Sequence, residues 1–192
     1  MAIAAVSLAG AAFAPPAEAA YIVNFVEVGG DVVATGSGSL DLADLTLNSI
    51  SSASGYVKGS WGIAVSGGPS LMKDWTGFSG PSGTFGPGAG FGSSTDSGDL
   101  VGIALVYGEM WVKYSYVSGA SLSSSSTWTG ATLGSLGLTT GSYTWTWGSG
   151  EHADSYTLNI GETVPEPTSL ALLGLAAAGL AGFRWRRPRA AD

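Results

Sequence analysis

The chain has 192 residues, with 14 acidic and 7 basic side chains and a net charge of −7 at pH 7. This acidic balance argues against nucleic acid and anionic membrane surfaces as partners. Cysteine is absent from the sequence, which excludes disulfides, thiol catalysis and thiolate metal sites, so a folded domain must be stabilised by a packed core.

The N-terminal residues 1–13 are apolar and small, and they predict a signal peptide that spans residues 1–19. Ala17 and Ala19 place small side chains at positions −3 and −1 of a signal peptidase cleavage after Ala19. No Lys or Arg precedes the apolar stretch, so the sequence leaves the true translation start open. A buried N-terminal helix is the alternative, which Pro15 and Pro16 disfavour because they end the apolar run.

Residues 20–163 form the predicted ectodomain, a length suited to one domain with its own core. Eleven acidic side chains against three lysines give this segment a net charge of −8. Glycine occupies 31 of the 192 positions, which by itself suggests disorder. Seven tryptophans and seven tyrosines indicate a folded, turn-rich domain instead, because disordered segments lack the aromatic residues that build a core.

Short runs that alternate apolar and polar residues recur along this segment, separated by glycine. Such runs predict strands at residues 21–28, 31–37, 39–45, 56–65, 101–107, 110–117, 126–133, 141–148 and 155–160. Gly29 and Gly30 predict a tight hairpin turn between the first two strands, since glycine reaches positive φ. The sequence shows no fixed repeat, so the pattern predicts an all-β fold, an antiparallel β-sandwich of jelly-roll-like type.

Residues 77–99 lack this alternation and predict a long glycine-rich loop. Phe78, Phe85 and Phe91 recur in it at intervals of six or seven residues. These side chains would pin the loop to the surface of a sheet. A mobile surface loop is the alternative.

Tyr143, Trp145 and Trp147 alternate along one predicted strand, so their side chains share one face. Turned inward, they belong to the core; turned outward, they form a platform on which sugar rings stack. The core is favoured, because burial of a large aromatic side chain is among the largest contributions that a cysteine-free domain can gain. Trp61, Trp75, Trp111 and Trp128 present the same choice, and the sequence does not decide it.

Asp96 and Asp99 enclose a glycine-containing turn and are a candidate calcium site, because Ca²⁺ prefers oxygen ligands on flexible loops. The twelve-residue EF-hand pattern is missing, and turn-forming aspartates are the alternative. His152 is the chain's single histidine. A Ser-His-Asp site with Asp154 would lack a nucleophile elbow, so we expect an exposed loop histidine. One histidine and no cysteine also argue against a zinc site.

Glycoside hydrolysis requires two carboxyl groups across a cleft, and the sequence offers three close pairs: Asp41 with Asp44, Asp96 with Asp99, and Glu151 with Asp154. Spacing alone places none of these pairs in a cleft, and acidic turn residues explain them equally well. We therefore expect no catalytic residues, no enzyme, and no cofactor other than the candidate calcium ion.

Residues 164–192 form a tail of three parts. Pro165, Glu166 and Pro167 remain extended, because two prolines fix φ and prevent a regular helix. The uncharged apolar run 169–183 would rise about 22 Å as a helix, less than a hydrocarbon core of roughly 30 Å. A basic cluster at 184–189 then contains Arg184, Arg186, Arg187 and Arg189. Because such charges stay in the cytoplasm, the arginines halt translocation. The shortness of the apolar run then predicts a transient stop in the membrane, with an ordinary single-pass anchor as the alternative.

From Val164 to Arg189 the tail resembles the PEP-CTERM sorting signal of bacterial exported proteins. The resemblance implies processing near Pro165–Pro167 by exosortase, a membrane protease or transpeptidase, during a transient insertion into the inner membrane. It also implies a bacterium that makes extracellular polysaccharide. Residues 29–42, 116–119 and 141–155 resemble the opening and closing parts of an ectodomain found ahead of such tails, which has no activity to transfer.

The expected function is that of an exported structural or adhesive protein at the cell surface or in the extracellular matrix, associated with exopolysaccharide. A carbohydrate-binding module is the alternative, and a hydrolase acting on glycans is less favoured. The expected partners are signal peptidase, an exosortase-like membrane enzyme and exopolysaccharide.

Overall fold

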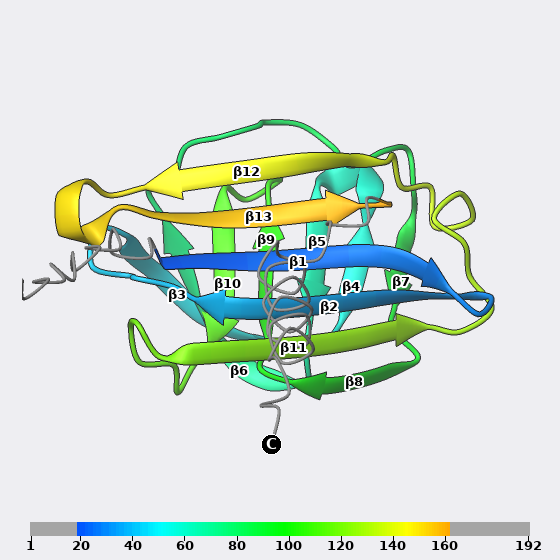
Figure 1. The fold of residues 1–192 in the computed structure, drawn as a ribbon, viewed down its shortest axis with the longest axis horizontal. Coiled ribbons are helices and arrows are strands. Elements are labelled where there is room, and N and C mark those ends of the chain that lie inside the picture. Colours follow the sequence, from blue (N-terminus) through cyan, green and yellow to red (C-terminus); the bar gives the residue numbers. More distant parts are fainter. Residues whose placement is uncertain (1–18, 162–192) are drawn as a thin grey trace, which may run out of the picture.

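The structure, a computed structural model, describes residues 19–161, which form two β-sheets (Figure 1). The first sheet has the strand order β12 (Gly141–Trp147), β13 (Asp154–Ile160), β1 (Ala19–Val28), β2 (Asp31–Ser39), β11 (Ser121–Trp128) and β8 (Thr95–Gly98). The second sheet has the order β3 (Thr46–Ala53), β6 (Ser70–Thr76), β10 (Glu109–Lys113), β9 (Val101–Ala104), β5 (Ile63–Ser66), β4 (Tyr56–Lys58) and β7 (Gly90–Gly92). Two short 3-10 helices, η1 (Gly59–Trp61) and η2 (Gly150–His152), complete the described elements.

The two sheets cross each other. In Figure 1 the strands of the first sheet run across the view in front, and those of the second sheet run up and down behind them. This is the orthogonal mode of sheet packing rather than the aligned one. Among the described residues, no helix is long or apolar enough to span a membrane. The predicted all-β fold is thus confirmed as two packed sheets.

Strand pairing is antiparallel in both sheets except between β1 and β13, which pair in parallel from Ala19 with Asp154 to Phe25 with Ile160. A purely antiparallel fold was therefore the wrong expectation at this pair. On its other edge β1 forms the predicted hairpin with β2, where Val28 pairs with Asp31. Gly29 and Gly30 form that turn with φ of 62° and 92°, which side chains with a Cβ rarely adopt.

The main core lies between the two sheets and is dominated by aromatic side chains. Tyr21, Phe25, Trp145 and Tyr156 of the first sheet are fully buried there, and they face Ile103 and other residues of the second sheet. Each such aromatic side chain removes 150 to 250 Å² from water, at roughly 25 cal/mol per Å². Aromatic burial thus supplies the stabilisation that disulfides cannot.

A short chain of hydroxyl groups crosses this core. The hydroxyl of Tyr21 lies 2.7 Å from Ser124 Oγ, and Ser124 Oγ lies 2.6 Å from Ser66 Oγ on the second sheet. Burial raises the pKa of Tyr21, so the phenol stays protonated and available for these bonds. Ser124 of β11 is satisfied in this way, and buried Ser126 bonds Asp96, so a serine-rich strand can face the core.

Several predicted strand boundaries were wrong. Residues 40–45 form a loop rather than a strand. Leu40, Leu42 and Leu45 are buried there, so the apolar alternation came from a loop that closes the core. Residues 56–65 are two strands, β4 and β5, separated by η1 and Gly62 at φ 63°. The strand expected at 126–133 lies earlier, as β11. The pattern also missed β3 and β6.

The stretch 77–99 is held to the sheets by Phe85, as the first of the two interpretations expected. Phe85 is fully buried, and its ring meets those of Tyr143 and Trp145 edge-on at 5.1 and 6.0 Å between centroids. Phe91 remains exposed. The stretch also contributes β7 and β8, which were not predicted.

Candidate functional site

The aromatic row of β12 belongs to the core. Trp145 and Trp147 are only 1% and 5% exposed, and Tyr143 is partly buried against the same cluster. Their indole N–H groups donate to main-chain oxygens, from Trp145 to Pro81 at 2.9 Å and from Trp147 to Asp41 at 2.6 Å. A sugar platform built from these three side chains is therefore wrong, because their ring faces pack against protein.

The candidate calcium ligands have other partners. Asp99 forms a salt bridge with Lys113 Nζ at 2.6 Å and accepts a hydrogen bond from the Ser123 amide at 3.0 Å. Asp96 accepts hydrogen bonds from the hydroxyls of Ser93 at 2.6 Å and Ser126 at 2.5 Å. The two carboxylates thus have separate sets of partners, and the calcium site stays a prediction.

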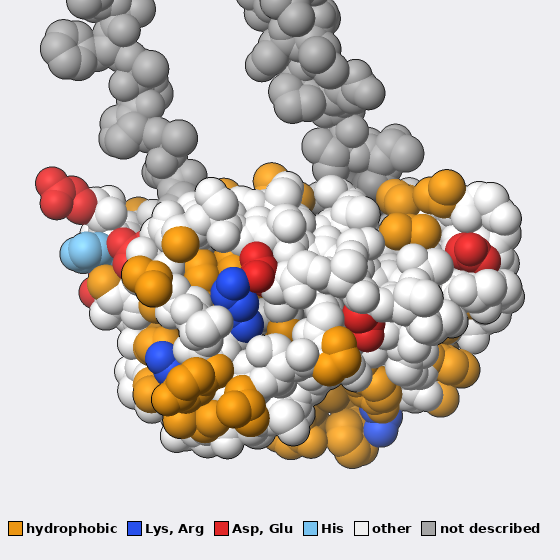
Figure 2. Space-filling model, turned by 90° about the horizontal axis from the view of Figure 1, so that it is seen from below, with side chains coloured by type: hydrophobic (Ala, Val, Ile, Leu, Met, Phe, Trp, Pro, Cys, Tyr) orange, Lys and Arg blue, Asp and Glu red, His pale blue; other side chains and the backbone are white. Residues whose placement is uncertain are grey.

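In place of the predicted carboxylate pairs, the fold brings Asp41, His152 and Asp154 together. His152 Nδ1 lies 2.7 Å from Asp41 Oδ2, and the Asp41 amide donates to Asp154 Oδ2 at 2.5 Å. Ser118 Oγ donates to the second oxygen of Asp41 at 3.0 Å. Figure 2 shows the histidine at one end of the molecule, among acidic side chains.

The titration of this cluster follows from its geometry. Burial raises the pKa of Asp154 to about 6, although two amide hydrogen bonds favour its charged form and act to lower the pKa. The hydrogen bond with His152 lowers the pKa of Asp41, and the same contact raises the pKa of exposed His152. The contact therefore favours an ion pair between His152 and Asp41, beside the buried carboxyl of Asp154.

The cluster lacks the serine–histidine contact of a Ser-His-Asp triad. Ser118 contacts the carboxylate of Asp41 rather than the imidazole of His152, so this hydroxyl is not placed for activation by the histidine. Asp154 is 5% exposed and unavailable to a substrate. Within residues 19–161, no three His, Asp or Glu side chains gather as metal ligands. The geometry instead fixes the β2–β3 loop to the start of β13.

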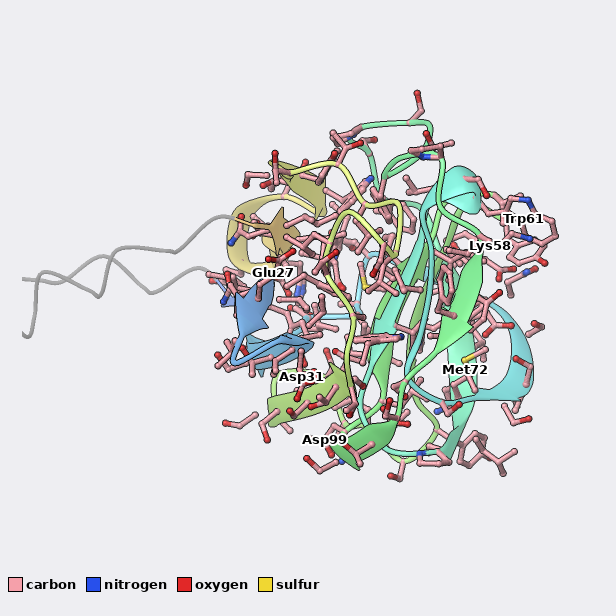
Figure 3. The ribbon with its side chains drawn as sticks, turned by 90° about the vertical axis from the view of Figure 1, so that its right-hand side faces the viewer. Glu27, Asp31, Lys58, Trp61, Met72 and Asp99 are labelled. Carbon is pink, nitrogen blue, oxygen red and sulfur yellow. The ribbon has the colours of Figure 1, made fainter. Side chains whose placement is uncertain are left out.

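A second group of side chains lies on the face of the second sheet that is turned away from the first. Figure 3 shows Lys58, Trp61 and Met72 on this side. Ile63, Val65, Met72, Leu100 and Ala104 form a separate buried apolar cluster, against which Trp111 packs. We call Trp61, Tyr107 and Trp111 together the aromatic face.

The rings of Tyr107 and Trp111 stack, and the main chain of Trp61 lies beside the turn that holds Tyr107. The Val106 amide donates to the Trp61 carbonyl at 3.1 Å, which places the β9–β10 turn beside η1. Tyr107, the next residue in that turn, is nearly parallel to Trp111, with an interplanar angle of 21° and 6.3 Å between ring centroids. Trp61 is 44% exposed and Tyr107 is 55% exposed.

Polar groups surround these rings. Glu109 accepts hydrogen bonds from Trp111 Nε1 at 3.0 Å and from Asn48 Nδ2 at 2.7 Å. Lys58 Nζ lies 3.0 Å from the centroid of the Trp61 ring. Asp74 lies opposite Trp111 in the sheet, and burial raises its pKa, although Ser49 Oγ donates to one of its oxygens.

Two hollows share Gly83 and Leu105 in their walls, and one of them adjoins the aromatic face. The smaller, of about 280 Å³, lies beside Trp61 and includes Ser60 and Thr84. The second, of about 350 Å³, lies under the glycine-rich loop that begins at Phe78. A larger hollow of about 660 Å³, at the far end of β1, has Glu27 as its single titratable residue. The hollow beside Trp61 therefore combines an exposed ring with hydroxyl groups.

The sequence pattern gave Trp61 and Trp111 as separate residues and did not predict that they share one surface. One signal was present: Glu109, Trp111 and Lys113 alternate with buried Met110 and Val112 along β10, so the indole had to lie opposite the core. Tyr107 gave no such signal, because it lies in a turn.

The comparisons with known proteins concern the tail, which lies outside the described residues, as do Pro165–Pro167, the apolar run, the arginines and the predicted signal peptide. The family model described as the PEP-CTERM protein-sorting motif matches residues 163–187. No curated protein and no solved structure matches the chain. The match confirms the resemblance read from the tail. The chain carries a PEP-CTERM protein-sorting motif, which marks an exported protein sorted to the cell surface as an exosortase substrate.

Proposed function

We propose that the protein is a non-enzymatic structural or adhesive component of the bacterial cell surface or extracellular matrix, associated with exopolysaccharide. In this proposal signal peptidase removes residues 1–19, and the apolar run 169–183 inserts transiently into the inner membrane. An exosortase-type enzyme then processes the chain near Pro165–Pro167. The observation that carries the proposal is the sorting motif at residues 163–187.

The described body is consistent with this route. Strand β1 begins at Ala19, so cleavage after that residue would leave the strand from Ala20 onward. Four residues separate Ile160, the end of β13, from Pro165, and four extended residues span at most about 14 Å. The folded body would therefore stand directly at the membrane surface while the tail is processed.

The sorting step is tested by replacing Pro165, Glu166 and Pro167 with alanine in the producing bacterium. We expect the unchanged chain to lose its tail and to leave the inner membrane, and the variant to keep its full C-terminal mass and remain there. Glu162→Ala is the matched control, because it removes a carboxylate just outside the matched segment. A triple variant with unaltered mature mass and destination would show that the tail is an ordinary anchor.

The matrix association is tested separately, by recovering the polysaccharide fraction from washed cells and measuring the protein in it. We expect the processed chain to co-purify with polysaccharide and to be released when the polysaccharide is removed. A chain that reaches the surface but stays free of polysaccharide would contradict the association and leave the sorting step intact.

A carbohydrate-binding module is the second candidate, and the exposed rings of Trp61 and Tyr107 favour it. A hydrolase is less favoured, because Asp41 and Asp154 are joined through an amide hydrogen bond rather than facing each other across a cleft.

A further inference from the structure

The aromatic face remains exposed although it could have been buried. A tryptophan or tyrosine that packs fully removes 150 to 250 Å² from water. Trp61 and Tyr107 nevertheless leave about half of their surface in solvent, and Val106 between them is 49% exposed. The Val106 amide bonds the Trp61 carbonyl and Tyr107 follows Val106 in the chain, so these three exposed side chains gather as an apolar strip at one end of the second sheet. Exposed apolar side chains that gather in this way are candidates for a binding surface.

The strip is held in place before any ligand arrives. Trp111 is fixed by its hydrogen bond to Glu109 and by the apolar cluster beneath it. Tyr107 lies parallel to Trp111, and the ammonium group of Lys58 lies over Trp61. A ligand that stacks on these rings therefore orders few side chains, and the entropic cost of binding is small.

The groups around the rings match the chemistry of a sugar chain. A hexopyranose ring has an apolar face of C–H groups and a rim of hydroxyls, which suits an aromatic ring surrounded by hydrogen-bonding groups. Ser60 and Thr84 supply hydroxyls in the hollow beside Trp61. Glu109 supplies carboxylate lone pairs, and Lys58 supplies N–H donors.

The charge of the body selects among sugar chains. Residues 20–163 contain eleven acidic side chains against three lysines, so the field of the domain repels a polyanion. Asp74 and Glu109 stand next to Trp111 on the aromatic face itself. An uncharged chain meets neither obstacle.

We propose that the aromatic face binds a neutral polysaccharide, with sugar rings stacked on Trp61 and Tyr107 and their hydroxyls bonded to Lys58, Glu109 and the hydroxyl-lined hollow. The inference rests on the proposed function for the setting in which the ligand is met, and it specifies the surface that contacts it. Neither residue belongs to the main core, so both can be changed without loss of the fold.

The test is affinity electrophoresis of the full chain, solubilised in a sugar-free polyoxyethylene detergent, through gels that contain hydroxyethyl cellulose, galactomannan or alginate. We expect retardation by at least one neutral polymer, and a dissociation constant about tenfold or more higher for Trp61→Ala and Tyr107→Ala. Trp61→Tyr, which keeps a ring, should retain most of the binding. Tyr114→Ala is the matched control, since it removes an exposed ring that also lies near a lysine, 4.9 Å from Lys73 Nζ.

Three results would overturn the inference. Unchanged retardation of Trp61→Ala and Tyr107→Ala would place the sugar site elsewhere. Retardation by alginate alone, or by none of the polymers, would exclude a neutral ligand. A dimer in sedimentation experiments that Trp61→Ala dissociates would assign the face to a second copy of the chain. In each case the cell fractionation described above decides the proposed function independently, so the two failures are distinguishable.

Discussion

The raised pKa of Asp154 predicts a pH-dependent stability that one substitution should remove. The carboxyl is 5% exposed, and burial raises its pKa from 3.8 to about 6. A folded state that binds the proton more tightly than the unfolded state loses stability as pH rises between these two values. A difference of about two pKa units corresponds to about 3 kcal/mol, so the free energy of unfolding should fall by up to this amount between pH 4 and pH 7 through Asp154.

Asp154→Asn should abolish that component. The amide also alters the hydrogen bonds with the Asp41 and Ser155 amides, but this cost does not depend on the titration of residue 154. The informative quantity is therefore the slope of the unfolding free energy against pH, measured by urea denaturation with tryptophan fluorescence from pH 4 to 7.5. The slope for the variant should be more positive than that of the unchanged chain.

Asp44→Asn provides the matched control, because Asp44 is an exposed carboxylate at the same end of the molecule. It should leave the slope close to that of the unchanged chain. Parallel curves for the unchanged chain and Asp154→Asn would refute the reasoning, since they would mean that burial does not perturb this carboxyl.

Three further predictions concern contacts described above. The single histidine can be titrated by proton NMR, and its midpoint should lie above 6.5 and move down toward 6.5 in Asp41→Asn. The stability that the ion pair contributes through His152 should disappear as pH rises through that midpoint. An unchanged midpoint in the variant would contradict the ion pair. Phe85→Ala should lower the free energy of unfolding by about 3 to 5 kcal/mol in urea denaturation, because it opens a cavity among aromatic rings. Phe91→Ala removes an exposed ring and should lower it far less. Equal losses for the two variants would refute the role of Phe85 in anchoring the loop. Gly80→Ala should destabilise the fold by about 1 to 3 kcal/mol, because a Cβ there would lie 2.6 Å from the Trp145 ring and 2.7 Å from the Thr144 carbonyl oxygen. Gly92→Ala is the control and should be nearly neutral, because its Cβ would meet nothing within 4 Å. Similar urea midpoints for the two variants would contradict the predicted clash at Gly80.

Strands with clear alternation could be predicted from the sequence. Val23, Phe25 and Ile160 lie on strands whose apolar residues face one core, and the Gly29–Gly30 hairpin has its own local signal. Strand β3 could not be found in this way, because its side chains are exposed along almost its whole length and no core imposes a period on it. Strand β11 begins earlier than predicted, because Ser124 and Ser126 satisfy their hydroxyls inside the sandwich.

The candidate sites depended on pairings that local sequence does not encode. Asp41 and His152 are 111 residues apart, and they meet because Asp154 opens the strand that pairs with the start of β1. The aromatic face required the crossover that places η1 beside the β9–β10 turn. The tail was different: its signal is contiguous in sequence, so the match at residues 163–187 needed no fold.

The parallel pairing of β1 with β13 joins the first described strand to the last. Neither the first sheet nor its edge strand β12 can be completed until Ile160 is available, because β13 lies between β12 and β1. Long-range pairing of this kind makes folding slow and dependent on the whole segment. In an exported chain, the body can therefore close only after nearly all of it has crossed the membrane, at the moment when the sorting motif itself arrives there. Under the proposed route, the fold is therefore completed no earlier than the arrival of the sorting motif at the membrane.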